Sequence, residues 1–257
     1  MRKFSLALTA LVFLVICGIL IGLVLYPPLP SLAASLASPE IQFAIVLSLW
    51  TSVVSTGICI AIALPVSYAL ARYRFKGSRI VNLVLTMPLA LPPLVAGIAL
   101  LLFFGTTPLG KALDALGFSV IFTPLGIIVA EVFVNLPYMI RILRSAFAMV
   151  NPRYEYVART LGCTETGSFF QVTLPMSRPG LLAGTAITWS KSMGEFGAVL
   201  LLAGATTMRT ETLPIALYLN VSAGDLSRAV AAATILIVIS LAALCVVELF
   251  ARDVNVF

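Results

Sequence analysis

The chain has 257 residues, of which 61% are hydrophobic and 10% are charged, against about 25% charged residues in a typical soluble protein. Polar residues are too few to cover a soluble domain of this length, and the same composition excludes intrinsic disorder. The chain has no histidine and no Cys-x-x-Cys pair, so we expect it to bind no metal ion and no cofactor. The composition predicts an all-α, polytopic membrane protein.

Six segments are apolar and long enough to cross a membrane as helices, which takes about 20 residues. In chain order they cover residues 4–26, 41–71, 80–105, 120–149, 181–203 and 229–250. The second is too long for a simple span, so it must tilt or project into water. We predict six transmembrane helices in one transmembrane domain over residues 1–257, with a core at 40–250.

The positions of lysine and arginine predict the orientation. If the N-terminus is cytoplasmic, twelve of the sixteen Lys and Arg residues lie on the cytoplasmic side. Only Lys111, Arg209 and Arg228 lie outside, and Lys191 falls within the fifth segment. We therefore expect a multi-pass protein of the cytoplasmic (inner) membrane with both termini inside. The net charge of +6 then reflects topology and contact with anionic lipid, so we predict no nucleic-acid binding.

The third segment is interrupted by Pro88, Pro92 and Pro93. Each proline lacks a backbone donor and frees a carbonyl one turn earlier. In lipid, those carbonyls need protein or a water-filled cavity, and broken helices often line transport pathways. We therefore place Pro92 and Pro93 on a translocation pathway, with a simple packing kink as the alternative.

Two opposite charges lie four residues apart in the fifth segment, Lys191 and Glu195. Charges at membrane depth are costly and usually face protein or water. We predict that this stretch lines the pathway or its gate, with Phe196 as a hydrophobic gate residue. The alternative is that the two charges neutralise each other or pair across a dimer, with Phe196 packed in the core.

The stretch from Gly105 to Lys111 has the G-x-x-x-x-G-K spacing of a phosphate-binding loop. The next residue is Ala112, so the hydroxyl that such loops use to hold Mg²⁺ is missing. The orientation also places this stretch outside the cell, away from ATP. We therefore predict no nucleotide site in this chain.

The cytoplasmic stretch between the fourth and fifth segments contains strong helix signals. Asn151 is a good N-cap, Pro152 suits the first helical position and Gly162 is a good helix stop, which predicts a short helix over 152–161. A second short helix should run from about 164 to 171 and stop ahead of Pro175.

The helix over 152–161 should have one apolar and one polar face. Glu155 and Arg159 form an i, i+4 pair on the polar face. The apolar face consists of Tyr154, Val157, Ala158 and Leu161. Such a patch suggests a partner surface, and the alternative is a loop that packs on its own helices.

Gly162, nine further residues and then Val172-Thr-Leu174-Pro175 resemble the EAA loop of ABC importer permeases. Glu155 stands one residue earlier than in the family pattern, and Tyr156 and Val157 replace its first two residues. Other stretches are similar to the sulfate/molybdate branch of these permeases. They are the residues 64–72, 88–102, 194–198, 209–218 and 224–226.

The resemblance implies a type I ABC importer permease that imports molybdate or tungstate and has no catalytic activity of its own. Two copies of a separate ATPase would use ATP and Mg²⁺, an extracytoplasmic binding protein would deliver the oxyanion, and a second permease copy would complete a homodimer. The alternatives are a sulfate/thiosulfate permease of the same kind, or a self-contained channel or secondary anion carrier.

In this interpretation the loop at about 150–180 couples the permease to the ATPase. The coupling residues would be Tyr154, Glu155, Val157, Ala158, Arg159, Leu161, Gly162, Leu174 and Pro175.

Overall fold

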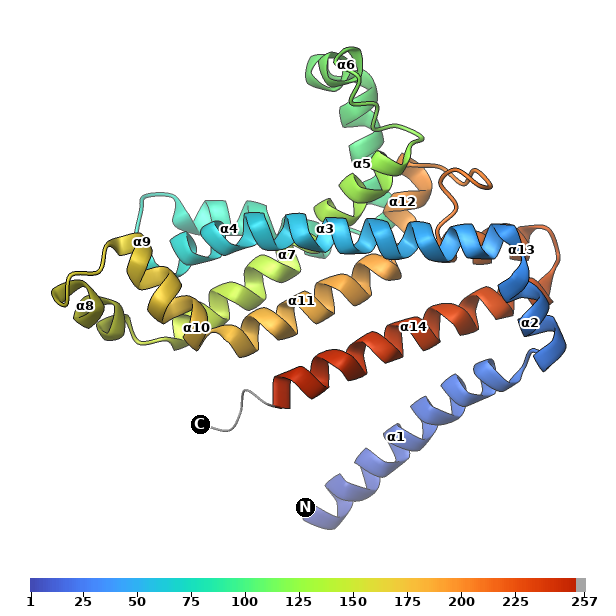
Figure 1. Cartoon of the computed structure of the whole chain (residues 1–257), viewed down its shortest axis with the longest axis horizontal. Helices are drawn as coiled ribbons and strands as arrows, with labels where there is room; N and C mark the ends of the chain where they lie inside the picture. Colours follow the sequence, from blue (N-terminus) through green and yellow to red (C-terminus); the bar gives the residue numbers. More distant parts are fainter. Residues whose placement is uncertain (253–257) are drawn as a thin grey trace.

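The computed structural model describes the backbone of residues 1–252, and their side chains other than those of 29, 243, 244 and 246–252. Within these residues the regular structure is entirely helical (Figure 1). The helices are α1 (Arg2–Leu25), α2 (Leu29–Ala37), α3 (Pro39–Arg72), α4 (Ser78–Thr86), η1 (Met87–Ala90), α5 (Pro93–Thr106), α6 (Pro108–Ala115), α7 (Pro124–Met149), α8 (Pro152–Thr160), α9 (Glu165–Ser168), η2 (Phe169–Thr173), α10 (Leu174–Met176), α11 (Arg178–Met193), α12 (Gly197–Leu202), α13 (Leu213–Ser222) and α14 (Leu226–Arg252). This confirms the all-α prediction.

The centre of the fold is α3, which packs along α7 and α11. Its N-terminus is capped by Ser38, whose hydroxyl accepts a hydrogen bond from the N–H of Ile41 at 3.4 Å, and Pro39 occupies the first helical position. With 34 residues, α3 is about 50 Å long at 1.5 Å per residue. That length exceeds the hydrocarbon core of about 30 Å, as predicted for the second segment.

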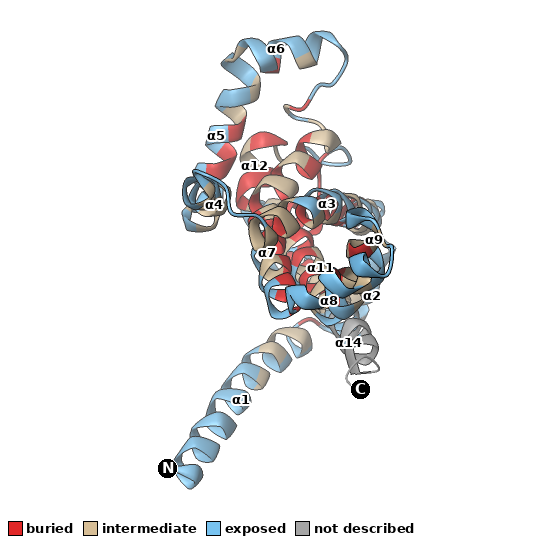
Figure 2. Cartoon of the chain, turned by 90° about the vertical axis from the view of Figure 1, so that its left-hand side faces the viewer, coloured by how far each residue is buried: buried red, intermediate tan, exposed pale blue. Residues whose placement is uncertain are grey.

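The buried side chains lie where α3, α7, α11 and α12 meet, whereas α1 and α6 are almost wholly exposed (Figure 2). The largest cluster joins the outer half of α7 to α5 and α12 through Ile127, Ala130, Leu202 and their neighbours. A second cluster joins α3 to α7 near Met139 and Phe147. These contacts hold in place the segments that carry the candidate site.

The third segment is not one straight helix, because α4 with η1 and then α5 are bent by 114°. Leu91 and Pro92 are extended, with ψ of 134° and 138°, since a residue that precedes proline is disfavoured in the α region. Pro92 and Pro93 therefore lie at a sharp bend, and α5 with α6 projects to one side of the other helices (Figure 1).

The fifth segment is also broken, which corrects the expectation of one helix over 181–203. Helix α11 ends at Met193, and α12 begins at Gly197. Gly194, Glu195 and Phe196 form the break between them.

Three of the described helices, α1, α3 and α7, are long and apolar enough to cross a membrane, and the bent pair can provide a fourth span. The chain ends of α1 and α14 both point toward the side of α8 (Figure 1). The count of six spans and the cytoplasmic termini stay predictions.

The two bent segments contact each other closely at glycines. A Cβ on Gly197 would lie 2.8 Å from the Cβ of Pro93, and one on Gly97 would lie 2.9 Å from the Cα of Ala198. Real Cβ atoms do not approach neighbours this closely. Helices α5 and α12 therefore contact each other through backbone that only glycine permits.

We expect Gly197→Ala to destabilise the purified protein by about 1–3 kcal/mol, because the added methyl group overpacks the contact with Pro93. In thermal unfolding in detergent this corresponds to a Tm lower by roughly 2–10 °C. Gly57→Ala in α3 is the matched control, since a Cβ there meets nothing within 4 Å. Equal Tm values for the two variants would contradict the close contact.

Candidate functional site: a coupling surface and a transmembrane seam

Helix α8 forms as the sequence predicts. The side chain of Asn151 accepts a hydrogen bond from the N–H of Arg153 at 3.0 Å. At the other end Gly162 is left-handed, with a φ of +96°, and the N–H of Cys163 donates to the carbonyl of Ala158 at 3.1 Å. This is a Schellman C-cap, for which glycine is preferred. Both ends of α8 are therefore defined by local sequence.

One face of α8 presents apolar side chains to the outside. Tyr154, Val157 and Leu161 are 53%, 56% and 81% exposed. Ala158 is half-buried and Arg159 is exposed beside them. We call Tyr154, Val157 and Leu161 the coupling surface. Large apolar side chains exposed together on a short helix outside the predicted spans are the expected signature of a protein contact.

Glu155 lies on the opposite side of α8 and is buried by its own chain. Its carboxylate accepts hydrogen bonds from the Nε of Arg72 at 2.8 Å, from the hydroxyl of Tyr68 at 2.8 Å and from the hydroxyl of Thr173. A second guanidinium nitrogen of Arg72 donates to the carbonyl of Val150 at 2.9 Å. This Glu155 cluster ties α8 to the end of α3 and to η2.

The predicted Glu155–Arg159 pair is therefore wrong. The carboxylate turns away from Arg159 because Arg72 offers it a buried, hydrogen-bonded ion pair. Such a pair outcompetes an exposed i, i+4 contact, which is worth only a few tenths of a kcal/mol. Glu155 thus positions the coupling surface and is not part of it.

The Glu155 cluster also controls the ionisation of that carboxyl group. Burial by itself would raise the pKa of Glu155. The hydrogen bonds from Thr173, Tyr68 and Arg72, together with the charge of Arg72, outweigh burial and hold this pKa below its usual value. The carboxylate is consequently charged at neutral pH, which keeps the guanidinium of Arg72 paired.

The second short helix predicted in this stretch does not stop ahead of Pro175. Helix α9 passes into the π-helical turn η2 and then into α10, which contains Leu174 and Pro175. The N–H of Leu174 donates to the carbonyl of Phe169 across the wider π turn. A π turn changes the hydrogen-bond register, and the chain remains helical through Pro175. Leu174 and Pro175 are half-buried and lie behind the coupling surface.

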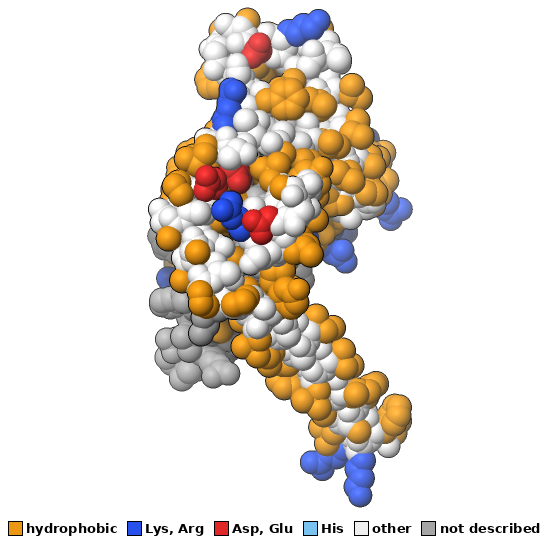
Figure 3. All heavy atoms as spheres, turned by 90° about the vertical axis from the view of Figure 1, so that its right-hand side faces the viewer, with side chains coloured by type: hydrophobic (Ala, Val, Ile, Leu, Met, Phe, Trp, Pro, Cys, Tyr) orange, Lys and Arg blue, Asp and Glu red, His pale blue; other side chains and the backbone are white. Residues whose placement is uncertain are grey.

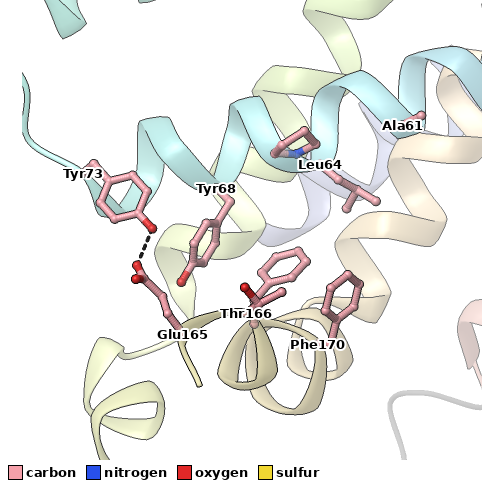
Figure 4. Close-up of a pocket in the computed structure, with 9 residues that line it drawn as sticks. Ala61, Leu64, Tyr68, Tyr73, Glu165, Thr166 and Phe170 are labelled. Atoms are coloured by element: carbon pink, nitrogen blue, oxygen red, sulfur yellow. Dashed lines mark hydrogen bonds between the residues drawn. The ribbon is translucent and has the colours of Figure 1, made fainter. Parts of the chain in front are cut away.

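Aromatic side chains connect this cytoplasmic segment to α3. The ring of Tyr68 lies 4.8 Å from that of Phe169 and 6.1 Å from that of Phe147, in edge-to-face geometry. Beside them is an open pocket of about 570 Å³ between α3 and the α9–η2 segment, where the hydroxyl of Tyr73 donates to Glu165 (Figure 4). Edge-to-face pairs add about 0.5–1.5 kcal/mol each, so α9 and α3 are stiffly connected.

The structure brings together most of the residues predicted for the pathway. Gly197, which follows Phe196, lies against Pro93, so the breaks of the third and fifth segments are adjacent. The ring of Phe196 packs against that of Tyr218 at 5.4 Å. The predicted pathway residues Pro92, Pro93, Glu195 and Phe196 therefore belong to one region of the fold, where the two breaks meet.

Lys191 and Glu195 do not neutralise each other. In the part of the chain that the structure describes, no ion pair joins them within 4.0 Å. The ammonium group of Lys191 lies 4.3 Å from the ring centre of Tyr138. The carboxylate of Glu195 accepts a hydrogen bond from the N–H of Ala198 at 3.1 Å. Because α11 ends at Met193, Glu195 leaves the helix and caps the start of α12.

A buried polar seam runs between α3, α7 and α11. The hydroxyl of Ser192 accepts hydrogen bonds from the hydroxyl of Ser55 at 3.2 Å and from the side-chain amide of Asn135 at 3.0 Å. One turn further along α7, Glu131 accepts a hydrogen bond from the hydroxyl of Thr51 at 3.1 Å. The seam is not fully paired within the described part of the chain, because the Glu131 Oε2 and Asn135 Oδ1 atoms are buried without a hydrogen-bond partner there.

Our sequence analysis missed Ser55, Asn135 and Ser192 as members of this seam. A signal for one side of it was present, because the small polar residues of α3 recur at helical spacing. They are Ser48, Thr51, Ser52, Ser55 and Thr56, and all five are buried. The partner helices carry no comparable repeat, so the pairing required the tertiary structure.

Comparison with known proteins gives a consistent result. The chain matches the family described as “Binding-protein-dependent transport system inner membrane component” over residues 57–256. It is 38% identical over 224 residues to the molybdenum transport system permease protein ModB of Mycobacterium bovis, covering 87% of this chain and 84% of that protein.

A second relative and a solved structure extend the comparison. The sulfate transport system permease protein CysT of Salmonella typhimurium is 35% identical over 179 residues, covering 69% of this chain and 65% of that protein. A chain of a bacterial alginate ABC transporter, solved with a pentasaccharide-bound periplasmic protein, superposes with a TM-score of 0.80 at 16% identity. That match covers 99% of this chain and 95% of the other, and it supports the fold.

We expect Glu155→Gln to weaken the packing of α8 on α3 by about 3 kcal/mol at neutral pH, because it leaves the buried guanidinium of Arg72 without a counter-charge. Hydrogen–deuterium exchange of the α8 amides should become faster while α7 keeps its protection. Glu165→Gln is the control, since Glu165 is exposed and exposed contacts contribute little.

The wild type should show an acid dependence that Glu155→Gln lacks. A carboxyl group with a lowered pKa in the folded state stabilises fully above its unfolded pKa of about 4.3, and this contribution is lost as pH falls through the lower folded pKa. Protection of α8 in the wild type should therefore decline below about pH 4. An identical decline in Glu155→Gln would show that another group is responsible.

Proposed function

Because the chain belongs to the family of inner membrane components of binding-protein-dependent transport systems, we propose that it is the transmembrane subunit of an ATP-driven importer of molybdate or tungstate. The 38% identity to a molybdenum permease over most of both chains supports this substrate class. Molybdate and tungstate are tetrahedral dianions of nearly equal size, so they form one class. Sulfate is the second candidate, because a sulfate permease is 35% identical over a shorter stretch.

The coupling surface is the structural feature that supports an ATPase-driven mechanism. It presents Tyr154, Val157 and Leu161 on a short helix whose other side is anchored by the Glu155 cluster. The exposed apolar face of this helix fits a groove on a separate ATPase. Two copies of that ATPase would bind ATP and Mg²⁺. Closure of the ATPases would move α8, and the cluster would pass this movement to α3 as a rigid-body shift.

The two bent segments are where we place the translocation pathway. The α5–α12 contact lies beside Phe196 and Glu195, and it can rearrange without unfolding a continuous helix. Glu195 and Glu131 would repel a dianion, so we assign them structural roles and expect the pathway to pass the anion without holding it. Selectivity would then belong to an extracytoplasmic binding protein.

A second copy of the chain would complete the pathway. Helix α1 has no buried residue and contacts little besides α14. An apolar groove of about 600 Å³ between α3, α5 and α7 is lined by Phe103, Phe133 and Leu136, among others. These surfaces suit lipid or a homodimeric partner in the cytoplasmic membrane. Family membership favours this motor-driven assembly over a self-contained channel or carrier.

Negative charges introduced into the coupling surface by substitution should weaken the contact between the permease and the ATPase. We expect Val157→Asp together with Leu161→Asp to weaken co-purification of the ATPase by about tenfold or more, because both side chains would be desolvated in the groove. The permease itself should insert and unfold as the wild type does, since both residues are exposed. Leu116→Asp, at the residue that follows α6 and is 73% exposed, is the matched control, and loss of the ATPase in that variant as well would contradict the assignment.

The substrate is best tested on the cognate binding protein by isothermal titration. We expect molybdate and tungstate to bind at least about tenfold more tightly than sulfate, because specificity is a difference between affinities for anions of different size. A preference for sulfate would replace molybdate by the second candidate and leave the importer assignment intact.

A further inference from the structure

A polar pocket of about 410 Å³ lies where α6 meets the segment between α12 and α13. Lys111 of α6 and Arg209 of the α12–α13 segment both line it, together with Asp114, Ser119 and Thr123. These two cations are separated by almost a hundred residues in sequence. They are also two of the three cations that the positive-inside rule places outside the cell.

Neither cation of this pocket forms an ion pair with a described carboxylate within 4.0 Å. The ion pairs in the described part of the chain are Arg72 with Glu155 and Arg228 with Asp225, so neither Lys111 nor Arg209 is neutralised there. Asp114 is the one carboxylate among the lining residues, and it accepts a hydrogen bond from the hydroxyl of Ser119. The pocket therefore has a net positive charge and unused donors.

The walls of the pocket are structurally defined. The hydroxyl of Thr107 caps α6 by accepting a hydrogen bond from the N–H of Gly110 at 3.1 Å. A Cβ on Gly110 would collide with the backbone of Phe104, so only glycine allows α6 to fold back this tightly on α5. Lys111 follows Gly110 directly, and its position is set by this turn.

The surroundings make the pocket distinctive. The face at the α2–α13 end of the molecule is mostly hydrophobic, with charged side chains in small groups, and one group lies on and just below α6 at the top of the view (Figure 3). Helix α6 also lies well away from α8 (Figure 1). A second group, in the middle of the view, combines Asp or Glu with Lys or Arg side chains (Figure 3).

We propose that this pocket is a binding site for a tetrahedral oxyanion, held between Lys111 and Arg209. The inference rests on the proposed function in placing the pocket on the side from which substrate arrives. Lysine supplies a mobile ammonium and arginine a planar fork, and both are suited to oxyanions. The same chemistry would bind the free transported anion or the phosphate of a lipid headgroup.

The site is tested on the full complex in nanodiscs of phosphatidylcholine, without the binding protein, using radiolabelled molybdate and sulfate. We expect saturable binding that Lys111→Gln with Arg209→Gln weakens by at least about tenfold, because each lost charged hydrogen bond is worth roughly this factor. Arg228→Gln is the matched control, since Arg228 is an outer cation already paired with Asp225 at 3.3 Å. Equal binding by the double variant would overturn the proposal.

A second arm separates the two sources of the anion. In nanodiscs that contain phosphatidylglycerol, native mass spectrometry measures lipid retained by the wild type and by the double variant. Retention by the wild type alone, without binding of free molybdate or sulfate, would identify the headgroup as the ligand. If the wild type neither binds free molybdate or sulfate nor retains the lipid, the proposed site is refuted.

Uptake assays distinguish failure of this site from failure of the proposed function. With its binding protein present, the double variant should show a raised KM for uptake, while Arg228→Gln should match the wild type. If the wild-type complex imports an oxyanion but the double variant binds and transports as well as the wild type, only the site is refuted. If the wild-type complex imports none of the three oxyanions, the proposed function itself fails.

Discussion

The ion pair between Arg72 and Glu155 is the interaction on which the α8 end of the molecule depends. Both side chains are nearly buried, with side-chain exposures of 8% and 11%. A buried carboxylate is tolerated only when its oxygens are fully hydrogen-bonded, and Tyr68 and Thr173 complete that requirement. The pair joins the end of the longest helix to the helix that presents the coupling surface.

This arrangement explains how one short helix can serve as both anchor and contact. Successive residues on a helix point in different directions, so Glu155 faces α3 while Tyr154 and Val157 face outward. After the π turn η2, α10 leads through a turn at Ser177 into α11. The coupling surface is therefore linked to α3 through the Glu155 cluster and to α11 through η2 and α10.

The membrane part obeys a different constraint, because backbone groups freed by a break must find partners without water. The breaks at Pro92–Pro93 and at Gly194–Phe196 pack against each other, so their backbone groups face protein. Glu195 accepts a hydrogen bond from the buried N–H of Ala198 in the first turn of α12, and glycines allow the backbones to approach. In the seam, Ser192 likewise accepts hydrogen bonds from Ser55 and Asn135 across a three-helix contact.

Sequence patterns predicted the elements that depend on neighbouring residues. The caps at Asn151 and Gly162, the long apolar helix that became α3, and the exposed face of α8 all follow from local spacing. Patterns also predicted that the translocation pathway or its gate includes Pro92, Pro93, Glu195 and Phe196. They did not predict the bend of 114°. A proline interrupts its own helix, but it does not determine the direction of the helix that follows.

By itself, the sequence determined that this protein spans a membrane, that it has a short helix with an exposed apolar face beside its cationic side, and where its third segment is interrupted. These properties depend on composition and on residues within one or two helical turns. Only the tertiary structure decided that Glu155 binds Arg72 and not Arg159, that Lys191 and Glu195 separate, and that Lys111 and Arg209 share a pocket. In each case a charged side chain could contact a neighbour in the sequence or a residue from a distant segment. The contact that forms is the one that the fold brings within hydrogen-bonding reach, and burial favours it.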